Sequence, residues 1–186
     1  MSASGAREAL IAELRSHALV IGEVTLTSGA VAQYYVDAKR AILRPAGFRA
    51  LSALVAERCA SWGAEAVGGL SMGADAPACA ALAGGADALA FFVRKEVKAH
   101  GLQRRIEGPL LRPGTRCVVV EDVVTTGGST IAAIEAVREA ELEVCGVVAV
   151  LDRLAGGGEA IAAATGGAPY EALATIDDVH PERPDR

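Results

Sequence analysis

Two apolar runs in the second half of the chain constrain the fold most. Residues 118–120 and 147–151 are unbroken aliphatic stretches that do not alternate with polar residues. Strands of this kind are covered on both faces, as in a parallel sheet between two layers of helices. Earlier apolar runs at 64–70 and 88–93 are followed by a helical pattern and by a polar loop. The order predicts an α/β protein with a mostly parallel, twisted sheet flanked by helices.

The first 44 residues are expected to form a hood over this sheet. Apolar residues recur at helical spacing over 9–19, and residues 23–43 read as two extended segments joined by a turn at Ser28 and Gly29. A long amphipathic helix is predicted from Pro45, which suits a first helical position. We therefore expect one domain over residues 1–186, with a helix and a hairpin in residues 1–44.

Composition and charge exclude several classes of protein. Eighteen basic and 23 acidic residues give a formal net charge of −5, which argues against a surface for nucleic acid. No stretch reaches the roughly 18 apolar residues that a membrane span needs. Charged residues interrupt the N-terminus where an export signal would be apolar. The sequence predicts a cytoplasmic protein that binds neither nucleic acid nor membrane.

The four cysteines are expected to be buried free thiols. They form no CxxC pair and lie within or beside apolar stretches, which suits neither a zinc site nor disulfides. No metal site built from protein ligands is predicted.

The string VVVEDVVTTGGST, residues 118–130, is the strongest candidate for a functional site. Residues 118–120 are expected to end at the carboxyl edge of the sheet, and a helix is expected from Ser129. Backbone N–H groups of such a strand-to-helix loop, together with the hydroxyls of Thr125, Thr126 and Ser129, can hold a phosphate monoester. The plain alternative is a strand end followed by an ordinary turn and helix cap.

Glu121 and Asp122 need a different partner, because carboxylates repel a phosphate. They suit a pair of hydroxyls, a divalent cation or a carbon that becomes positive during reaction. A ribose 5-phosphate reacting at its anomeric carbon offers all three. A carboxylate about 4 Å from the positive anomeric carbon stabilises that charge by on the order of 4 kcal/mol at an effective dielectric near 20, before screening by salt.

Residues 94–109 contain a run of basic side chains, namely Arg94, Lys95, Lys98 and His100. A charge run alone is usually a solvated face. Beside an anion site at the same sheet edge, it is expected to be a mobile catalytic loop that brings positive charge to the ligand. The chain has no GxxxxGK[ST] motif, and no GxGxxG follows a predicted strand.

The string from residue 119 to 130 closely resembles the phosphoribosyl pyrophosphate (PRPP) signature of type I phosphoribosyltransferases. With LTSGAVAQYYVD, RKEVKAHG and LDR in the same order, the chain resembles the orotate phosphoribosyltransferase family over nearly its whole length. The resemblance implies the type I phosphoribosyltransferase fold and transfer of ribose 5-phosphate from PRPP to orotate in de novo UMP synthesis. It also implies Mg²⁺ bound mainly through PRPP, and a homodimer whose catalytic loop closes over the neighbouring subunit's site.

The same resemblance assigns roles to residues. Lys98 and Asp122 would be catalytic, and Thr125, Arg153, Tyr34 and Tyr35 would bind orotate. The PRPP-binding residues would be Arg94, Lys95, Lys98, His100, Glu121, Asp122, Val123, Val124, Thr125, Thr126, Gly127, Gly128 and Ser129. From the residues alone, His100 could be an ordinary surface histidine, Arg153 could pair with Asp152, and the two tyrosines could be packing residues.

The sequence departs from the family in two places. Gly73 and Ala74 stand where many relatives have Tyr-Lys, and Thr27 replaces a lysine. Both changes remove positive charge near the expected substrates. Two other functions remain open at this point: a purine phosphoribosyltransferase, and a non-catalytic regulator that senses PRPP on the same fold.

Overall fold

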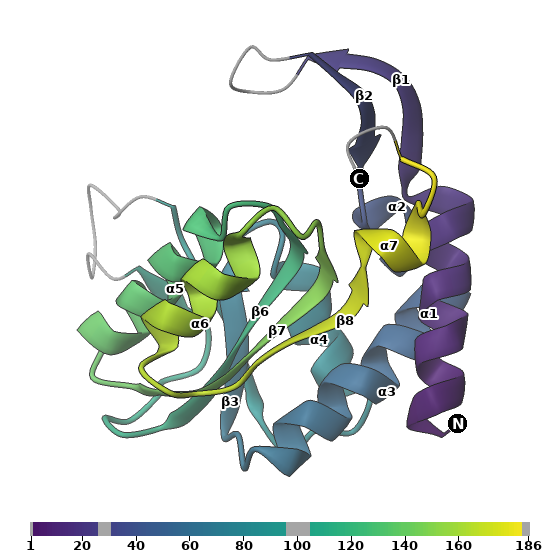
Figure 1. Ribbon diagram of the computed structural model, residues 1–186. Coiled ribbons are helices and arrows are strands. Elements are labelled where there is room, and N and C mark those ends of the chain that lie inside the picture. Colours follow the sequence, from purple (N-terminus) through teal and green to yellow (C-terminus); the bar gives the residue numbers. More distant parts are fainter. Residues whose placement is uncertain (1, 26–30, 96–104, 184–186) are drawn as a thin grey trace.

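The computed structural model describes residues 2–25, 31–95 and 105–183 (Figure 1). A six-stranded sheet lies at the centre, in the order β5-β4-β3-β6-β7-β8. Neighbouring strands are parallel except β5, which is antiparallel to β4. The strands are β3 (Ala66–Leu70), β4 (Leu89–Val93), β5 (Ile106–Glu107), β6 (Arg116–Val124), β7 (Glu143–Asp152) and β8 (Tyr170–Thr175). The predicted mostly parallel sheet is confirmed.

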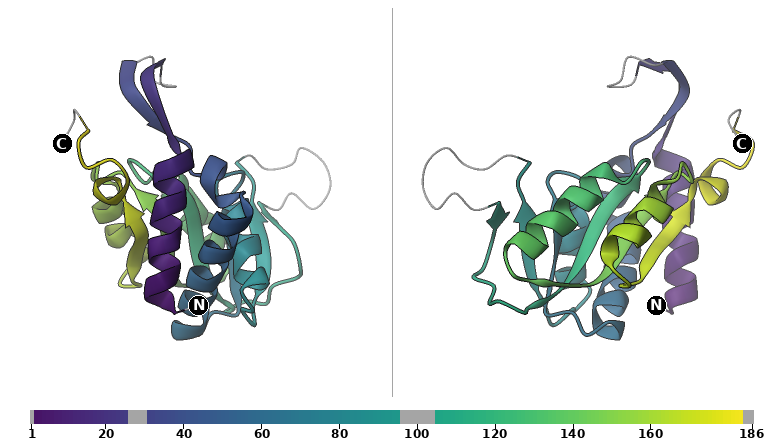
Figure 2. Two further views of the ribbon diagram at one scale, coloured as in Figure 1. Left: turned by 90° about the vertical axis from the view of Figure 1, so that its right-hand side faces the viewer. Right: turned by 60° about the vertical axis from the view of Figure 1, so that its left-hand side comes forward.

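Helices cover both faces of this sheet (Figures 1 and 2). Val118 and Val120 of β6 join the core on one face, whereas Cys117 and Val119 join the core on the other. This two-sided burial explains why the strand has no polar alternation. The helices on the first face are α1 (Ala3–His17), α3 (Pro45–Ser61) and α4 (Asp75–Ala83), and those on the second are α5 (Gly128–Glu139) and α6 (Gly157–Thr165).

The predicted N-terminal helix and hairpin are present. Helix α1 starts earlier than the apolar spacing indicated, because Ser2 caps it by accepting a hydrogen bond from the Gly5 N–H at 3.3 Å. Strands β1 (Leu19–Thr25) and β2 (Val31–Val36) pair antiparallel and project from the body of the molecule (Figure 1). A short helix, α2 (Lys39–Ile42), then leads the chain back to α3.

A short C-terminal helix, α7 (Ile176–Val179), was not predicted. Thr175 and Asp178 form a capping box at its start, which a four-residue helix needs because it has little packing of its own. The Arg7 guanidinium donates to Asp178 at 2.9 Å and so ties α7 to α1. Helix α7 therefore lies beside α1.

The expected end of β6 was wrong. The strand continues to Val124, so Glu121 and Asp122 lie inside it rather than after it. The reason is the length of β7, which keeps pairing with β6 as far as Val124 and Asp152. On the other side, pairing with β3 stops at Val119. Beyond that point the loop after β3 lies against β6.

The expectation for the cysteines was wrong at one position. Cys59, Cys117 and Cys145 are buried, but Cys79 is exposed, because the inner face of α4 is formed by its alanines. All four are free thiols. Burial raises the pKa of Cys59 to about 11, so this thiol is neutral at ordinary pH. Among the described residues, no helix has the length and apolar character to cross a membrane.

Candidate active site

The acidic pair lies at the carboxyl end of β6, where ligands bind in open α/β sheets. Glu121 and Asp122 are 5% and 7% exposed, which is rare for carboxylates. Asp122 Oδ1 accepts a hydrogen bond from the Val123 N–H at 2.8 Å. Glu121 Oε2 accepts one from the Thr130 hydroxyl at 3.4 Å. Both acids are thus held by the strand and by the first turn of α5.

The buried environment changes the protonation of Glu121. Burial, followed by the charge of the neighbouring Asp122, raises the pKa of Glu121 to about 8. Glu121 is therefore mostly protonated at neutral pH. The cation described next lies against the other acid, Asp122.

Lys39 of α2 is a site residue that sequence reasoning missed. Its Nζ donates to Asp122 Oδ2 at 2.7 Å and lies 3.5 Å from Asp37 Oδ1. Burial alone would lower the pKa of Lys39, but its hydrogen bond to Asp122 and the charges of Asp122 and Asp37 raise it. One signal was available, since Lys39 is one of only three lysines in the sequence and lies two positions after the YYVD string.

The loop after β6 has the form expected of a phosphate site. Residues 121 and 123–130 line a cavity of about 270 Å³. Gly127 caps α5 with a φ of +82°, a conformation that favours glycine. Thr125, Thr126 and Ser129 are exposed at the start of the helix. The predicted strand-to-helix junction is confirmed, and it presents hydroxyls beside a helix N-terminus.

The loop after β3 closes the site on its other side. A Cβ added to Gly73 would lie 2.3 Å from Glu121 Oε1 and 2.7 Å from Asp122 Oδ1. Ala74 is fully buried, and its methyl group packs against Gly69 of β3. The two positions that depart from the family pattern thus lie directly beside or behind the acidic pair.

Arg153 and Tyr34 meet at the end of β7. The Arg153 guanidinium lies over the Tyr34 ring, 5.1 Å from its centre. The backbone N–H of Arg153 donates to the backbone oxygen of Val124 at 2.9 Å. His180 packs edge-on against Tyr34, with ring centres 5.2 Å apart. Asp152 accepts hydrogen bonds from the Tyr170 hydroxyl and the Leu154 N–H. Tyr34 is buried, whereas Tyr35 is exposed.

The predicted basic loop is described only in part. The Arg94 guanidinium lies 3.6 Å from the Glu107 carboxylate. The backbone N–H of Arg94 donates to the backbone oxygen of Arg105 at 2.8 Å, which holds the base of the loop against β5. Lys95 is exposed. Lys98, His100 and also Thr27 of the hairpin lie outside the described residues.

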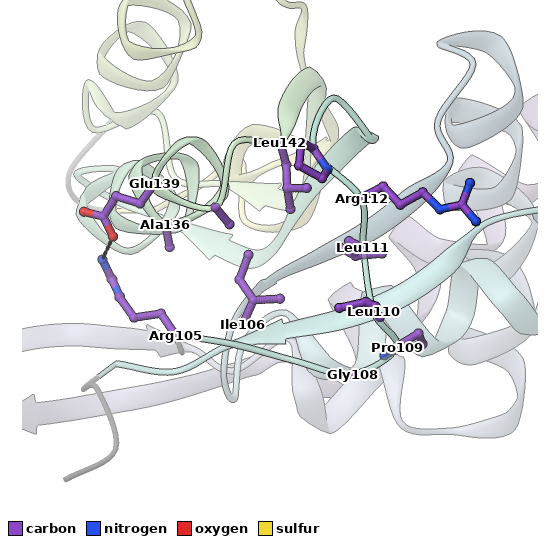
Figure 3. Close-up of a pocket in the computed structure, with 12 residues that line it drawn as sticks. Arg105, Ile106, Gly108, Pro109, Leu110, Leu111, Arg112, Ala136, Glu139 and Leu142 are labelled. Atoms are coloured by element: carbon purple, nitrogen blue, oxygen red, sulfur yellow. Dashed lines mark hydrogen bonds and ion pairs between the residues drawn. The ribbon is translucent and has the colours of Figure 1, made fainter. Parts of the chain in front are cut away.

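A larger cavity, of about 780 Å³, lies away from this site (Figure 3). Its lining includes Arg112 and Leu142, which precede β6 and β7, so it is near the amino ends of these strands. Arg105 and Glu139 form an ion pair across one side at 3.5 Å. Its lining has neither an acidic pair nor a glycine loop, and we therefore do not assign this cavity as the active site.

A metal ion at this site would need ligands from a bound substrate as well as from the protein. Within residues 2–25, 31–95 and 105–183, no group of three or more His, Cys, Asp or Glu side chains could hold a metal ion. The Asp122 carboxylate and the exposed Thr125 hydroxyl are oxygen ligands of the kind that Mg²⁺ prefers, and the ion would take most of its other ligands from a bound phosphate compound.

Comparison with known proteins agrees with this geometry. Residues 77–171 match the phosphoribosyl transferase domain family. The chain is 49% identical to the orotate phosphoribosyltransferase of Corynebacterium glutamicum (strain R), over 94% of each protein. It also matches orotate phosphoribosyltransferase from Mycobacterium tuberculosis H37Rv in complex with Fe(III) dicitrate, with a TM-score of 0.84 and 42% identity over 94% of this chain and 99% of that one. The complex of that enzyme with 5-phospho-alpha-D-ribosyl 1-diphosphate, PRPP, matches with a TM-score of 0.75 and 33% identity over 94% and 92%.

Proposed function

Since this chain belongs to the orotate phosphoribosyltransferase family, we propose that it transfers ribose 5-phosphate from PRPP to orotate. The products are orotidine 5'-phosphate and pyrophosphate, and the step belongs to de novo UMP synthesis. The observation that carries the proposal is the buried acidic pair beside the glycine and hydroxyl loop, at the carboxyl edge of a parallel sheet. A PRPP complex is known for a relative with the same fold.

The loop of residues 125–129 binds the 5-phosphate in this proposal. Its N–H groups and hydroxyls neutralise the phosphate without a lysine, because they lie at the N-terminus of α5. The ribose ring then extends toward β6, where Asp122 accepts hydrogen bonds from its hydroxyls. Binding the phosphate in this way fixes the position of the anomeric carbon.

Asp122 stabilises the positive charge that develops when the diphosphate leaves. The carbon–oxygen bond to the diphosphate breaks, and the electron pair departs with pyrophosphate. The orotate ring nitrogen forms the new bond to the anomeric carbon and loses its N–H proton to the departing pyrophosphate or to solvent. A carboxylate about 4 Å from the cation contributes on the order of 4 kcal/mol at an effective dielectric near 20, close to a thousandfold in rate. No side chain acts as a nucleophile.

Mg²⁺ bound through PRPP would neutralise charge on the diphosphate. The chain's own residues fit this arrangement, because Asp122 would accept hydrogen bonds from the ribose hydroxyls, and its Oδ2 already faces the Lys39 ammonium. The basic residues Arg94, Lys95, Lys98 and His100 add positive charge as residues 94–109 close over the site. In the proposed homodimer, that loop covers the site of the neighbouring subunit.

Arg153 is the proposed anchor for orotate. A guanidinium can bind the orotate carboxylate with two parallel hydrogen bonds, and its stacking on Tyr34 fixes the plane in which it presents them. Thr125, the first residue of the phosphate loop, directly follows Val124, whose backbone oxygen accepts a hydrogen bond from the backbone N–H of Arg153, and Thr125 is proposed to contact orotate as well. The exposed ring of Tyr35 is a candidate cover for the pyrimidine.

The test is a turnover assay with PRPP, Mg²⁺ and either orotate or a panel of purine bases, following pyrophosphate release. We expect release with orotate only. Release with a purine would identify a purine phosphoribosyltransferase, and PRPP binding without any release would identify a sensor. We also propose a cytoplasmic location, which fractionation of the producing cells would test.

A further inference from the structure

The loop after β3 cannot supply the cation that relatives place there. At position 73, the carboxyl oxygens of Glu121 and Asp122 occupy the space that a side chain would need. At position 74, the alanine is fully buried against Gly69, so a lysine stem would have to displace β3. The diphosphate of PRPP therefore needs positive charge from another element of the fold.

Lys39 contacts the other oxygen of the same carboxylate. The Gly73 backbone faces Asp122 Oδ1, and the Lys39 ammonium contacts Asp122 Oδ2 at 2.7 Å. An ammonium group has three donors, and the hydrogen bond to Asp122 uses one of them. The side chain remains 37% exposed, so it is open to the solvent side of the site.

The stereochemistry of PRPP places the diphosphate near this ammonium. In the α-anomer, the oxygen that carries the diphosphate lies on the same face of the ribose as the 2- and 3-hydroxyls. If Asp122 accepts hydrogen bonds from those hydroxyls, a cation that is hydrogen-bonded to Asp122 is within reach of the diphosphate. Lys39 also offsets the carboxylates of Asp122 and Asp37, which would otherwise repel the incoming anion.

We propose that Lys39 is a diphosphate-binding residue of this site, which supplies the charge that positions 73 and 74 lack. The proposal deepens the proposed function and rests on it. Lys39 orients Asp122 before the substrate arrives, and then donates to the α-phosphate oxygens while Asp122 turns to the ribose hydroxyls.

Isothermal titration calorimetry of inorganic pyrophosphate binding, in the presence of Mg²⁺, tests this role of Lys39 without requiring turnover. We expect K39M to weaken pyrophosphate binding by about tenfold or more, as for loss of one charge-assisted hydrogen bond. K39R should restore most of the affinity. The matched control is R40M, which removes the same charge from an exposed neighbour on the same helix. R40M should stay within about twofold of the unsubstituted protein.

A double-mutant cycle separates direct contact from an effect through Asp122. We expect K39M to weaken pyrophosphate binding on the D122N background as well. No further loss there would show that Lys39 acts only by orienting Asp122, and it would overturn the proposal. In steady state, K39M should raise the KM for PRPP and leave the KM for orotate within about twofold.

These results are distinguishable from failure of the proposed function. If the unsubstituted protein turns over orotate and K39M binds pyrophosphate equally well, the function stands and the role of Lys39 is refuted. If the unsubstituted protein turns over no base, the function fails, and the pyrophosphate titrations still decide whether Lys39 binds the diphosphate. Melting temperatures of all variants, measured in the same buffer, identify any loss caused by misfolding.

Discussion

At the scale of single residues, the site depends on the raised pKa of one carboxyl group. Glu121 is buried beside Asp122, and its pKa is raised from an ordinary value near 4.5 to about 8. An acid with a raised pKa in the folded state stabilises the protein fully at low pH. That stability decreases as the pH rises from the ordinary carboxyl value through the folded pKa. The relevant pH range is about 4.5 to 8.

The first prediction concerns Glu121→Gln. We expect the free energy of unfolding of the unsubstituted protein to decrease by on the order of a few kcal/mol between pH 5 and pH 8. Glu121→Gln should remove most of that decrease, because the amide cannot ionise. The measurement is urea unfolding across this range, with the exposed Glu135→Gln as the control. Equal pH slopes for the two variants would contradict the assignment.

The second prediction concerns Arg153, whose guanidinium is stacked on Tyr34. Arg153→Met should raise the KM for orotate by about tenfold or more, since it removes a bidentate charge-assisted contact. Arg153→Lys should recover only part of this, because an ammonium lacks the planar pair of donors. Steady-state kinetics at saturating PRPP measure both. A change confined to the KM for PRPP would refute the role.

At the scale of elements, the apolar runs at 118–120 and 147–151 were enough to predict a parallel sheet. They did not predict where β6 ends, because polar residues normally mark a strand end and Glu121 lies in mid-strand. The pairing partner decides the length, and β7 continues to Asp152. The short helix α7 was missed for a related reason, since only its capping box stabilises it locally.

The third prediction tests how α6 supports the phosphate loop. A Cβ added to Gly157, the first residue of α6, would lie 2.4 Å from Thr125 O and 2.9 Å from Gly127 N. Gly157→Ala should therefore destabilise the protein by about 1–3 kcal/mol and raise the KM for PRPP. As a control, Ala163→Gly on the exposed face of α6 should cost about 0.5–1 kcal/mol with an unchanged KM. Unchanged PRPP kinetics in Gly157→Ala would mean that the loop does not need this contact.

At the scale of the whole molecule, the N-terminal elements contact the carboxyl ends of β6 and β7 in two places. Lys39 pairs with Asp122, and Tyr34 packs against Arg153. The partners in the first pair are 83 positions apart in the chain. The resemblance predicted the acidic pair, the phosphate loop and Arg153, because each lies in a short local motif. It did not predict Lys39, since a contact between distant segments leaves no spacing pattern in the sequence.

The fourth prediction concerns the proposed homodimer with a shared catalytic loop. Lys98→Ala and Asp122→Asn should each be nearly inactive alone. Mixed after brief unfolding and refolding, they should recover about a quarter of full activity, because half of the dimers then contain one site with both native residues. Activity is measured as pyrophosphate release. No recovery from mixed subunits that do associate would show that each site uses the loop of its own chain.

The central claim is that the acidic pair receives the ribose of PRPP while the glycine loop holds its 5-phosphate. A crystal structure with PRPP and Mg²⁺ tests it most directly. We predict the ribose hydroxyls on Asp122, the 5-phosphate on residues 125–129 and the diphosphate toward Lys39. PRPP bound at the larger cavity near Leu142, or ordered density absent from Asp122 at saturating PRPP, would contradict the account.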